Sequence, residues 1–127
     1  MISVLIPTYD YNTLPLVTEL HQQLSVADIA FEIIVQDDAS PLNSNTDNNQ
    51  KINLLSDCRF ERNDTNLGRG QNRNALIQKA QFDWVLLMDC DMFPKSKGFI
   101  QNYIHQIQNS NHSVYFGGLQ YRAEKPE

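Results

Sequence analysis

The chain has 127 residues, of which 41% are hydrophobic and 20% charged, and it carries a net charge of −5 at pH 7. These values describe one globular domain over residues 1–127 and exclude a disordered or fibrous chain. The acidic balance gives no basic surface for nucleic acid, so an anionic ligand would need local donors or a metal ion.

No segment of the sequence predicts export or membrane insertion. Met1 leads directly into an apolar run without the charged region of a signal peptide. No apolar run approaches the roughly 18 residues of a membrane span. Cys58 and Cys90 have no further Cys or His at metal-ligand spacing, so reduced, buried thiols are expected. We therefore predict a cytoplasmic protein with no membrane segment in this chain.

The first part of the chain alternates between strand and helix patterns. An apolar, β-rich run predicts a buried strand over residues 2–6, which Pro7 would end. Apolar residues at helical spacing predict a helix that ends near Leu24, and a second buried strand follows over residues 31–35. Residues 43–49 are nearly all Asn, Ser, Thr and Asp, which predicts a turn-rich surface loop.

The same alternation continues to the end of the chain. Residues 58–62 alternate as a strand nearer the sheet edge would, and residues 72–80 predict a helix. The apolar residues 84–88 predict a central strand buried on both faces. A helix over residues 97–108 and a fifth strand over residues 114–116 complete the pattern. Strands and helices that alternate in this way predict a three-layer α/β sandwich around a mostly parallel sheet.

Polar residues follow three of the predicted strands. Thr8 and Tyr9 follow the first, Asp38 follows the second, and Asp89 and Asp91 follow the strand over residues 84–88. Because the carboxyl ends of parallel strands lie along one edge of a sheet, these groups are expected to converge there, where open α/β sheets bind their ligands.

Four blocks of the sequence resemble the family 2 glycosyltransferases of the GT-A fold. The blocks occur in the family's order and cover nearly the whole chain: residues 3–10, residues 32–40, Asn66-Leu67-Gly68 with Arg73-Asn74, and Asp89-Cys90-Asp91. The last block matches the family's DxD metal-binding signature. The resemblance implies a GT-A domain that carries the nucleotide-sugar-binding half of the enzyme, with the acceptor-binding half and the general base further along the chain.

The resemblance also implies a role for each matched residue near the base. Pro7, Thr8 and Tyr9 would line a uridine pocket, with the Tyr9 ring packed on the base. Asp38 would accept a hydrogen bond from the imide N–H of the base, which separates uracil from bases that lack that donor. A UDP-sugar is therefore the expected donor.

The remaining matched residues would hold the rest of the donor. Gly68 and Arg73 would lie near the nucleotide, where the guanidinium suits carbonyl or phosphate oxygens. Asp89 would contact the ribose or donor sugar, and Asp91 would bind Mn²⁺ or Mg²⁺ together with the diphosphate. The family pattern differs at Asp10, Ala39 and Met92, where Asn, Gly and an acidic residue are usual.

The implied reaction is an inverting, metal-dependent transfer of a sugar to the hydroxyl of an acceptor, which is a saccharide, a lipid or a protein-linked glycan. Such a transfer needs a base to deprotonate the hydroxyl, and no residue of this chain is assigned that role. A nucleotide-binding module without turnover is one alternative. A phosphatase that uses Asp89 and Asp91 is another.

Simpler roles remain open for several of these residues. Asp37 and Asp38 could cap the turn at Ser40, Arg73 could be a surface helix residue, and the Tyr9 ring could serve in ordinary packing. The segment Gly68-Arg69-Gly70 lacks a third glycine, so it is not a dinucleotide-binding fingerprint, and the absence of a following Gly-Lys-Ser/Thr excludes a P-loop.

Overall fold

Four parallel strands form one sheet in the computed structural model, which describes residues 1–118. Their order across the sheet is β3-β2-β1-β4. The strands are β1 (Ile2–Thr8), β2 (Phe31–Asp37), β3 (Cys58–Arg62) and β4 (Trp84–Leu87). The predicted parallel sheet is confirmed, and β3 lies at its edge as the alternating pattern predicts.

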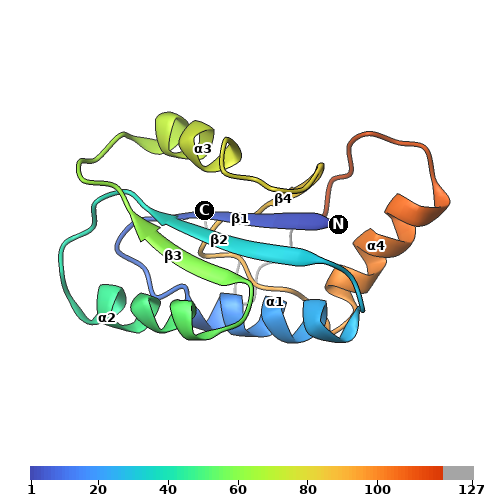
Figure 1. The fold of residues 1–127 in the computed structure, drawn as a ribbon, viewed down its shortest axis with the longest axis horizontal. Coiled ribbons are helices and arrows are strands. Elements are labelled where there is room, and N and C mark those ends of the chain that lie inside the picture. Colours follow the sequence, from blue (N-terminus) through green and yellow to red (C-terminus); the bar gives the residue numbers. More distant parts are fainter. Residues whose placement is uncertain (119–127) are drawn as a thin grey trace, which may run out of the picture.

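Helices cover both faces of this sheet (Figure 1). The helical elements are α1 (Leu14–Val26), α2 (Ser44–Gln50), the 3₁₀ helix η1 (Lys51–Leu54), α3 (Arg69–Ile77) and α4 (Phe99–Asn109). Helix α3 lies on one face, and α1 and α2 lie on the other (Figure 1). The three-layer sandwich is therefore confirmed. Within residues 1–118 we find no helix with the length and apolar character needed to cross a membrane.

The strands bury both faces because successive side chains point to opposite sides of the sheet. Val4 and Ile6 of β1 pack into the larger core, together with Leu20 of α1. Leu5 points the other way and packs with Leu76 of α3, and all of these side chains are fully buried. Each such Leu or Ile contributes about 1.5–3 kcal/mol of burial free energy.

Strand β1 runs two residues beyond its predicted end and includes Pro7. The Leu5 carbonyl accepts a 3.0 Å hydrogen bond from the Met88 N–H. The backbone N–H and C=O groups of Leu5, and of every second residue of β1 counted from it, therefore point toward β4. Pro7 faces that same side, beyond Leu87, the last residue of β4 that pairs with β1. Its missing N–H therefore removes no ladder bond, and the strand continues through the proline.

The prediction that residues 84–88 form a central strand buried on both faces is wrong. Within residues 1–118 β4 is an edge strand that pairs only with β1. Trp84 and Leu86 pack against the larger core, but Val85 and Leu87 are each 39% exposed. The reason is that α3 packs over β1 and β2 and leaves this face of β4 uncovered.

Residues 43–49 were expected to form a loop, and this is wrong, because α2 begins at Ser44. Asn43 caps the helix, since its side chain accepts from Asn45 N at 2.9 Å and its own N–H donates to Thr46 Oγ1 at 2.8 Å. The helix thus rests on capping and on buried polar contacts of Thr46 and Asn49.

Two further predictions are wrong. Residues 114–116 form no strand, and Val114 and Phe116 are exposed. Helix α3 lies over Arg69–Ile77 instead of residues 72–80, so that Asn72 joins Leu76 on its buried side while Ile77 is exposed. The helix therefore begins directly at the Gly68 loop.

Candidate functional site

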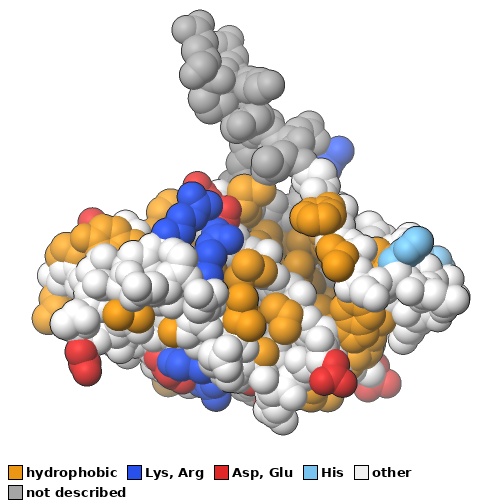
Figure 2. Space-filling model, turned by 90° about the horizontal axis from the view of Figure 1, so that it is seen from above, with side chains coloured by type: hydrophobic (Ala, Val, Ile, Leu, Met, Phe, Trp, Pro, Cys, Tyr) orange, Lys and Arg blue, Asp and Glu red, His pale blue; other side chains and the backbone are white. Residues whose placement is uncertain are grey.

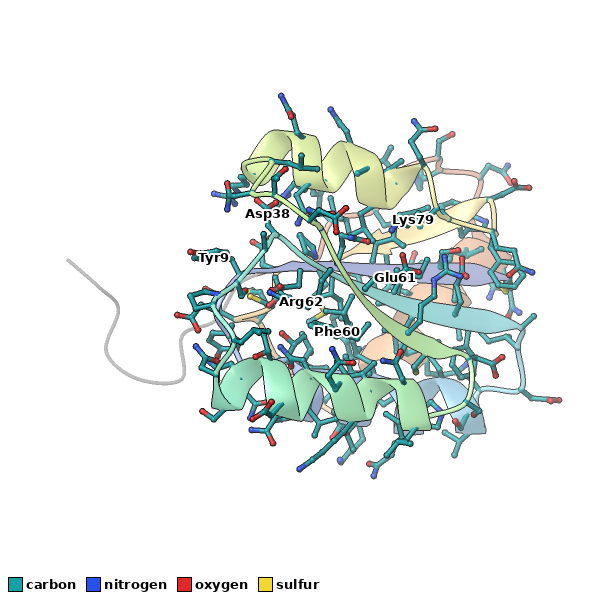
Figure 3. The ribbon with its side chains drawn as sticks, turned by 60° about the vertical axis from the view of Figure 1, so that its left-hand side comes forward. Tyr9, Asp38, Phe60, Glu61, Arg62 and Lys79 are labelled. Carbon is teal, nitrogen blue, oxygen red and sulfur yellow. The ribbon has the colours of Figure 1, made fainter. Side chains whose placement is uncertain are left out.

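The polar residues expected to converge do lie along one edge of the sheet. Strands β1, β2 and β4 are parallel, so the segments after Thr8, Asp37 and Leu87 emerge together. Figure 3 shows Tyr9 and Asp38 at this same end of the sheet. The site is therefore built from loops that are far apart in sequence, as the strand pattern predicts.

Asp38 is the most enclosed carboxylate among the predicted site residues, with 5% of its surface exposed. Its Oδ1 accepts hydrogen bonds from Asn63 Nδ2 at 2.9 Å and from the Leu67 N–H at 2.7 Å. Its Oδ2 accepts from the Gly68 N–H at 3.0 Å. The carboxylate therefore holds the loop before α3 against the end of β2.

Gly68 is the residue at which this loop turns into α3. Its φ of +84° lies in the region that favours glycine, although a Cβ there would meet no atom within 4 Å. The backbone conformation alone thus calls for glycine at this position. The conformation aims the Gly68 N–H at Asp38, which links the second and third blocks of the family pattern.

Asp37 has a structural role, which was the alternative for this residue. It is 1% exposed and accepts from the Ser40 N–H at 3.0 Å, which caps the turn. Arg62 Nε of β3 donates to the same carboxylate at 3.0 Å. With its charge paired and its oxygens occupied, Asp37 has no free group for a ligand.

Asp89 forms an ion pair with Arg73 of α3, and Arg69 Nη2 lies 4.0 Å from its other oxygen. Within the described part of the chain, Arg73 Nε is a buried donor without a hydrogen-bond partner. Figure 2 shows basic side chains gathered beside acidic ones on the face that carries α3, with hydrophobic side chains open to solvent next to them. Arg73 is thus held at Asp89 from α3, with 26% of its side chain exposed.

Thr8 and Tyr9 differ sharply in exposure. Thr8 is buried, and its Oγ1 lies 2.9 Å from Thr13 Oγ1. The Cys90 thiol contacts Thr8 and the Tyr9 backbone, and burial raises the pKa of that thiol, so it is neutral. The Tyr9 side chain is 54% exposed at the mouth of the site, which leaves a ring face open to a ligand. Pro7 is half-buried beside them.

Asp91 is exposed, and no hydrogen bond or ion pair within residues 1–118 holds its carboxylate. No group of three or more His, Cys, Asp or Glu side chains in that part of the chain is placed to hold a metal ion. A single free carboxylate still fits Mg²⁺ or Mn²⁺, because such ions are often held by one or two carboxylates plus substrate phosphates and water.

Sequence reasoning missed the amides that support this site. Asn63 donates to Asp38, and Asn72 lies on the buried side of α3 and is 2% exposed. A signal existed for Asn72, because it lies four residues before Leu76 on the buried stripe of the helix. None existed for Asn63, which the sequence does not distinguish from the many other asparagines.

The opposite edge of the sheet carries a separate hollow of about 230 Å³. It is lined by residues at the amino ends of β2 and β3, including Glu32, Asp57 and Arg59. None of the predicted site residues borders it. The chemistry-bearing residues and this hollow therefore lie at opposite ends of the strands.

A family model described as Glycosyl transferase family 2 matches residues 3–126. Chondroitin synthase of Pasteurella multocida (strain Pm70) is 27% identical over 121 residues, which are 94% of this chain and 12% of that protein. The chain thus spans a small part of this curated relative.

Solved structures show the same fold. S. aureus TarS 1–349 superposes with a TM-score of 0.63 at 28% identity, over 84% of this chain and 32% of that chain. The same protein in complex with UDP-GlcNAc gives a TM-score of 0.63 at 28% identity, over 84% and 31%. A mannosyltransferase from Pyrobaculum calidifontis, at 19% identity and a TM-score of 0.62, over 81% and 31%, shows the fold alone. Since the family model matches almost the whole chain, the chain belongs to glycosyl transferase family 2.

Proposed function

We propose that this chain binds the donor of a glycosyltransferase that moves a sugar from a UDP-sugar to an acceptor hydroxyl with inversion. The observation that carries the proposal is the Asp38 carboxylate, which is buried at the carboxyl edge and has accepting capacity left. The TarS structures, at 28–29% identity, contain UDP-GlcNAc and UDP, which supports uridine over other bases. Because the chain spans 32% of TarS 1–349, the whole reaction is part of the proposal.

The base would lie between Tyr9 and Asp38. The exposed Tyr9 ring offers a stacking surface, and Asp38 lies at the same end of the sheet (Figure 3). Uracil presents an imide N–H that a carboxylate can accept, whereas cytosine presents an acceptor nitrogen there. A buried carboxylate at this place therefore favours UDP over CDP.

The ribose and diphosphate would meet Asp89 and Arg73. Asp89 is the partner of Arg73, so the guanidinium is held in one place before the donor arrives. The Arg73 side chain keeps 26% of its surface exposed, which leaves it accessible to an oxygen of the nucleotide. The remaining exposure of Asp89, 46% of its side chain, leaves it accessible to a sugar hydroxyl.

Asp91 would hold the divalent cation, Mn²⁺ or Mg²⁺. The cation would supply charge neutralisation for the leaving diphosphate, which this acidic chain needs. Asp91 is suited to this part because its carboxylate is exposed and carries no other partner in the described residues. Asp89 is less suited as a metal ligand or as the nucleophile of a phosphatase, because Arg73 and Arg69 already neutralise it.

We also place this reaction in the cytoplasm. Cys58 and Cys90 are both free, which fits a reducing compartment.

Calorimetry with UDP and CDP tests the base-reading role. Asp38→Ala should weaken UDP binding by about 1–3 kcal/mol, because a buried hydrogen bond to the base is lost. The same substitution should reduce the preference for UDP over CDP. Asp57→Ala, an exposed aspartate at the opposite edge, serves as the control. Equal affinities of the wild-type protein for UDP and CDP would contradict the role of Asp38.

A second titration tests whether Asp91 holds the divalent cation. Mn²⁺ should tighten UDP binding to the wild-type protein, and Asp91→Ala should lose this metal-dependent part. Asp83→Ala is the matched control, since Asp83 is an exposed aspartate just before β4 instead of just after it. If Asp91→Ala keeps the full effect of Mn²⁺, the metal is not held at Asp91.

A further inference from the structure

Asn63 joins three parts of the molecule directly beneath the donor site. It follows β3, and its Nδ2 donates to Asp38 Oδ1 at 2.9 Å and to Asn72 Oδ1 of α3 at 2.8 Å. Its Oδ1 accepts from Gln36 Nε2 of β2 at 2.8 Å. Both amide protons and the amide oxygen are therefore engaged, by Gln36 and Asp38 at the end of β2 and by Asn72 of α3.

The bonds to Asp38 leave the carboxylate with little freedom. A carboxylate has about four lone-pair directions, two on each oxygen. Asn63 and the Leu67 N–H occupy both directions of Oδ1, and the Gly68 N–H occupies one direction of Oδ2. The direction that remains lies on Oδ2, so a donor group of a bound base has one place to bind.

The orientation of Asn63 is imposed from both ends of a hydrogen-bonded chain. Lys79 can only donate, and its Nζ lies 2.6 Å from Gln36 Oε1, so the Gln36 amide must point its Nε2 at Asn63. Asp38 can only accept, so Asn63 must point its Nδ2 at Asp38. The two charged ends thus select one direction for every amide between them.

Lys79 is itself fixed by Glu61 of β3, with which it forms an ion pair. The hydrogen bond from Lys79 lowers the pKa of the Glu61 carboxyl below its ordinary value. Figure 3 shows Lys79 and Glu61 close together between α3 and β3, further along the sheet than Asp38. The hydrogen-bonded network therefore runs from Lys79, which follows α3 and is partly exposed, through Gln36 and Asn63 to Asp38.

We propose that Asn63 is a positioning residue of the donor site. By its hydrogen bond to Asp38, Asn63 helps to leave a single lone-pair direction of that carboxylate free for the base. Asn63 does not touch the base in this arrangement; it acts through Asp38, and Lys79 acts through Gln36 and Asn63. The inference rests on the proposed function, since it assumes that Asp38 reads the base. It adds that the preference for uracil depends on an amide outside the pocket.

Asn63→Asp tests the inference with almost no change in shape. The substitution replaces the two amide protons by an acceptor oxygen that faces Asp38 Oδ1 and Asn72 Oδ1. UDP affinity measured by calorimetry should fall by about tenfold to a hundredfold, and CDP affinity should fall less, because the hydrogen bond lost is one to a charged group. Asn53→Ala is the control, since its amide holds the Phe60 N–H of β3 at 2.9 Å, away from Asp38. It should leave the UDP to CDP ratio unchanged.

A double substitution separates positioning from general damage. In an Asp38→Ala background, Asn63→Asp should no longer change the UDP to CDP ratio, because the residue through which it acts is gone. A purely structural role of Asn63 would instead lower both affinities equally in both backgrounds.

Lys79→Met provides a second variant in case Asn63→Asp does not fold. Lys79 lies at the half-exposed far end of the network, and its loss frees Gln36 to turn. It should also narrow the UDP to CDP ratio, by a smaller factor. If the folded variants keep the wild-type ratio while Asp38→Ala loses it, the positioning role is wrong and the proposed function stands. If the wild-type protein binds no UDP, both are wrong.

Discussion

At the scale of single residues, Ala39 occupies a position where the family usually has glycine. Its φ of 61° lies in the left-handed region, which costs an L-residue about 1–2 kcal/mol. Ala39→Gly should therefore stabilise the protein, by about 0.5–1 kcal/mol after the greater entropy loss of glycine is subtracted. Urea unfolding measures the change.

Ala75→Gly is the matched control for this substitution. Ala75 lies inside α3, where glycine should destabilise by about 0.5–1 kcal/mol. Opposite signs for the two substitutions are expected. A loss of stability for Ala39→Gly would mean that the left-handed backbone at residue 39 causes no strain.

Some residue roles could be read from the sequence and others could not. The departures at Asp10 and Ala39 were visible, and both residues have a positive φ. Asp37 and Asp38 could not be separated, because their different roles depend on partners from later segments. Arg62 neutralises Asp37, whereas the Leu67 and Gly68 N–H groups meet Asp38.

At the scale of elements, α2 braces the loop that carries Tyr9. Asn49 of α2 is 1% exposed, and its Oδ1 accepts from the Thr13 N–H at 2.8 Å. Its Nδ2 donates to the Tyr11 carbonyl at 2.8 Å. Asn49→Ala should therefore cost about 2–4 kcal/mol, because one buried and one partly buried backbone group lose their partners.

Thermal or urea unfolding checks this prediction, with Asn48→Ala as the control. Asn48 belongs to the same helix, but its side chain accepts only from Lys51 Nζ at 3.3 Å on the surface. A change within about 0.5 kcal/mol is expected for the control. Equal effects of the two substitutions would show that α2 does not brace the loop.

For two of the elements that the sequence predictions got wrong, α2 and β4, the physical reasons differ. Helix α2 has no apolar period, so its stability comes from the Asn43 cap and from contacts with the distant residues Thr13 and Tyr11. Strand β4 is apolar on both faces, yet one face is uncovered because α3 packs over other strands. A pattern within one segment contains neither fact.

At the scale of the whole molecule, the alternation of strands and helices was enough to predict that the polar residues after the strands share one edge of the sheet. Parallel strands send their carboxyl ends to one edge, so the convergence of Tyr9, Asp38 and Asp89 followed from the strand pattern and the polar residues after each strand. The order of the strands was not predictable in the same way. It depends on which strands pair, and therefore the position of β4 at an edge became known only from the structure.

The central claim is that the carboxyl edge of the sheet binds a nucleoside diphosphate. A titration of the protein with UDP and Mg²⁺, followed by backbone amide NMR, tests it residue by residue. We expect the largest shifts at Tyr9, Asp38, Gly68 and Asp89. Shifts confined to the hollow at the opposite edge, around Glu32 and Arg59, or no shifts at saturating UDP, would contradict the claim.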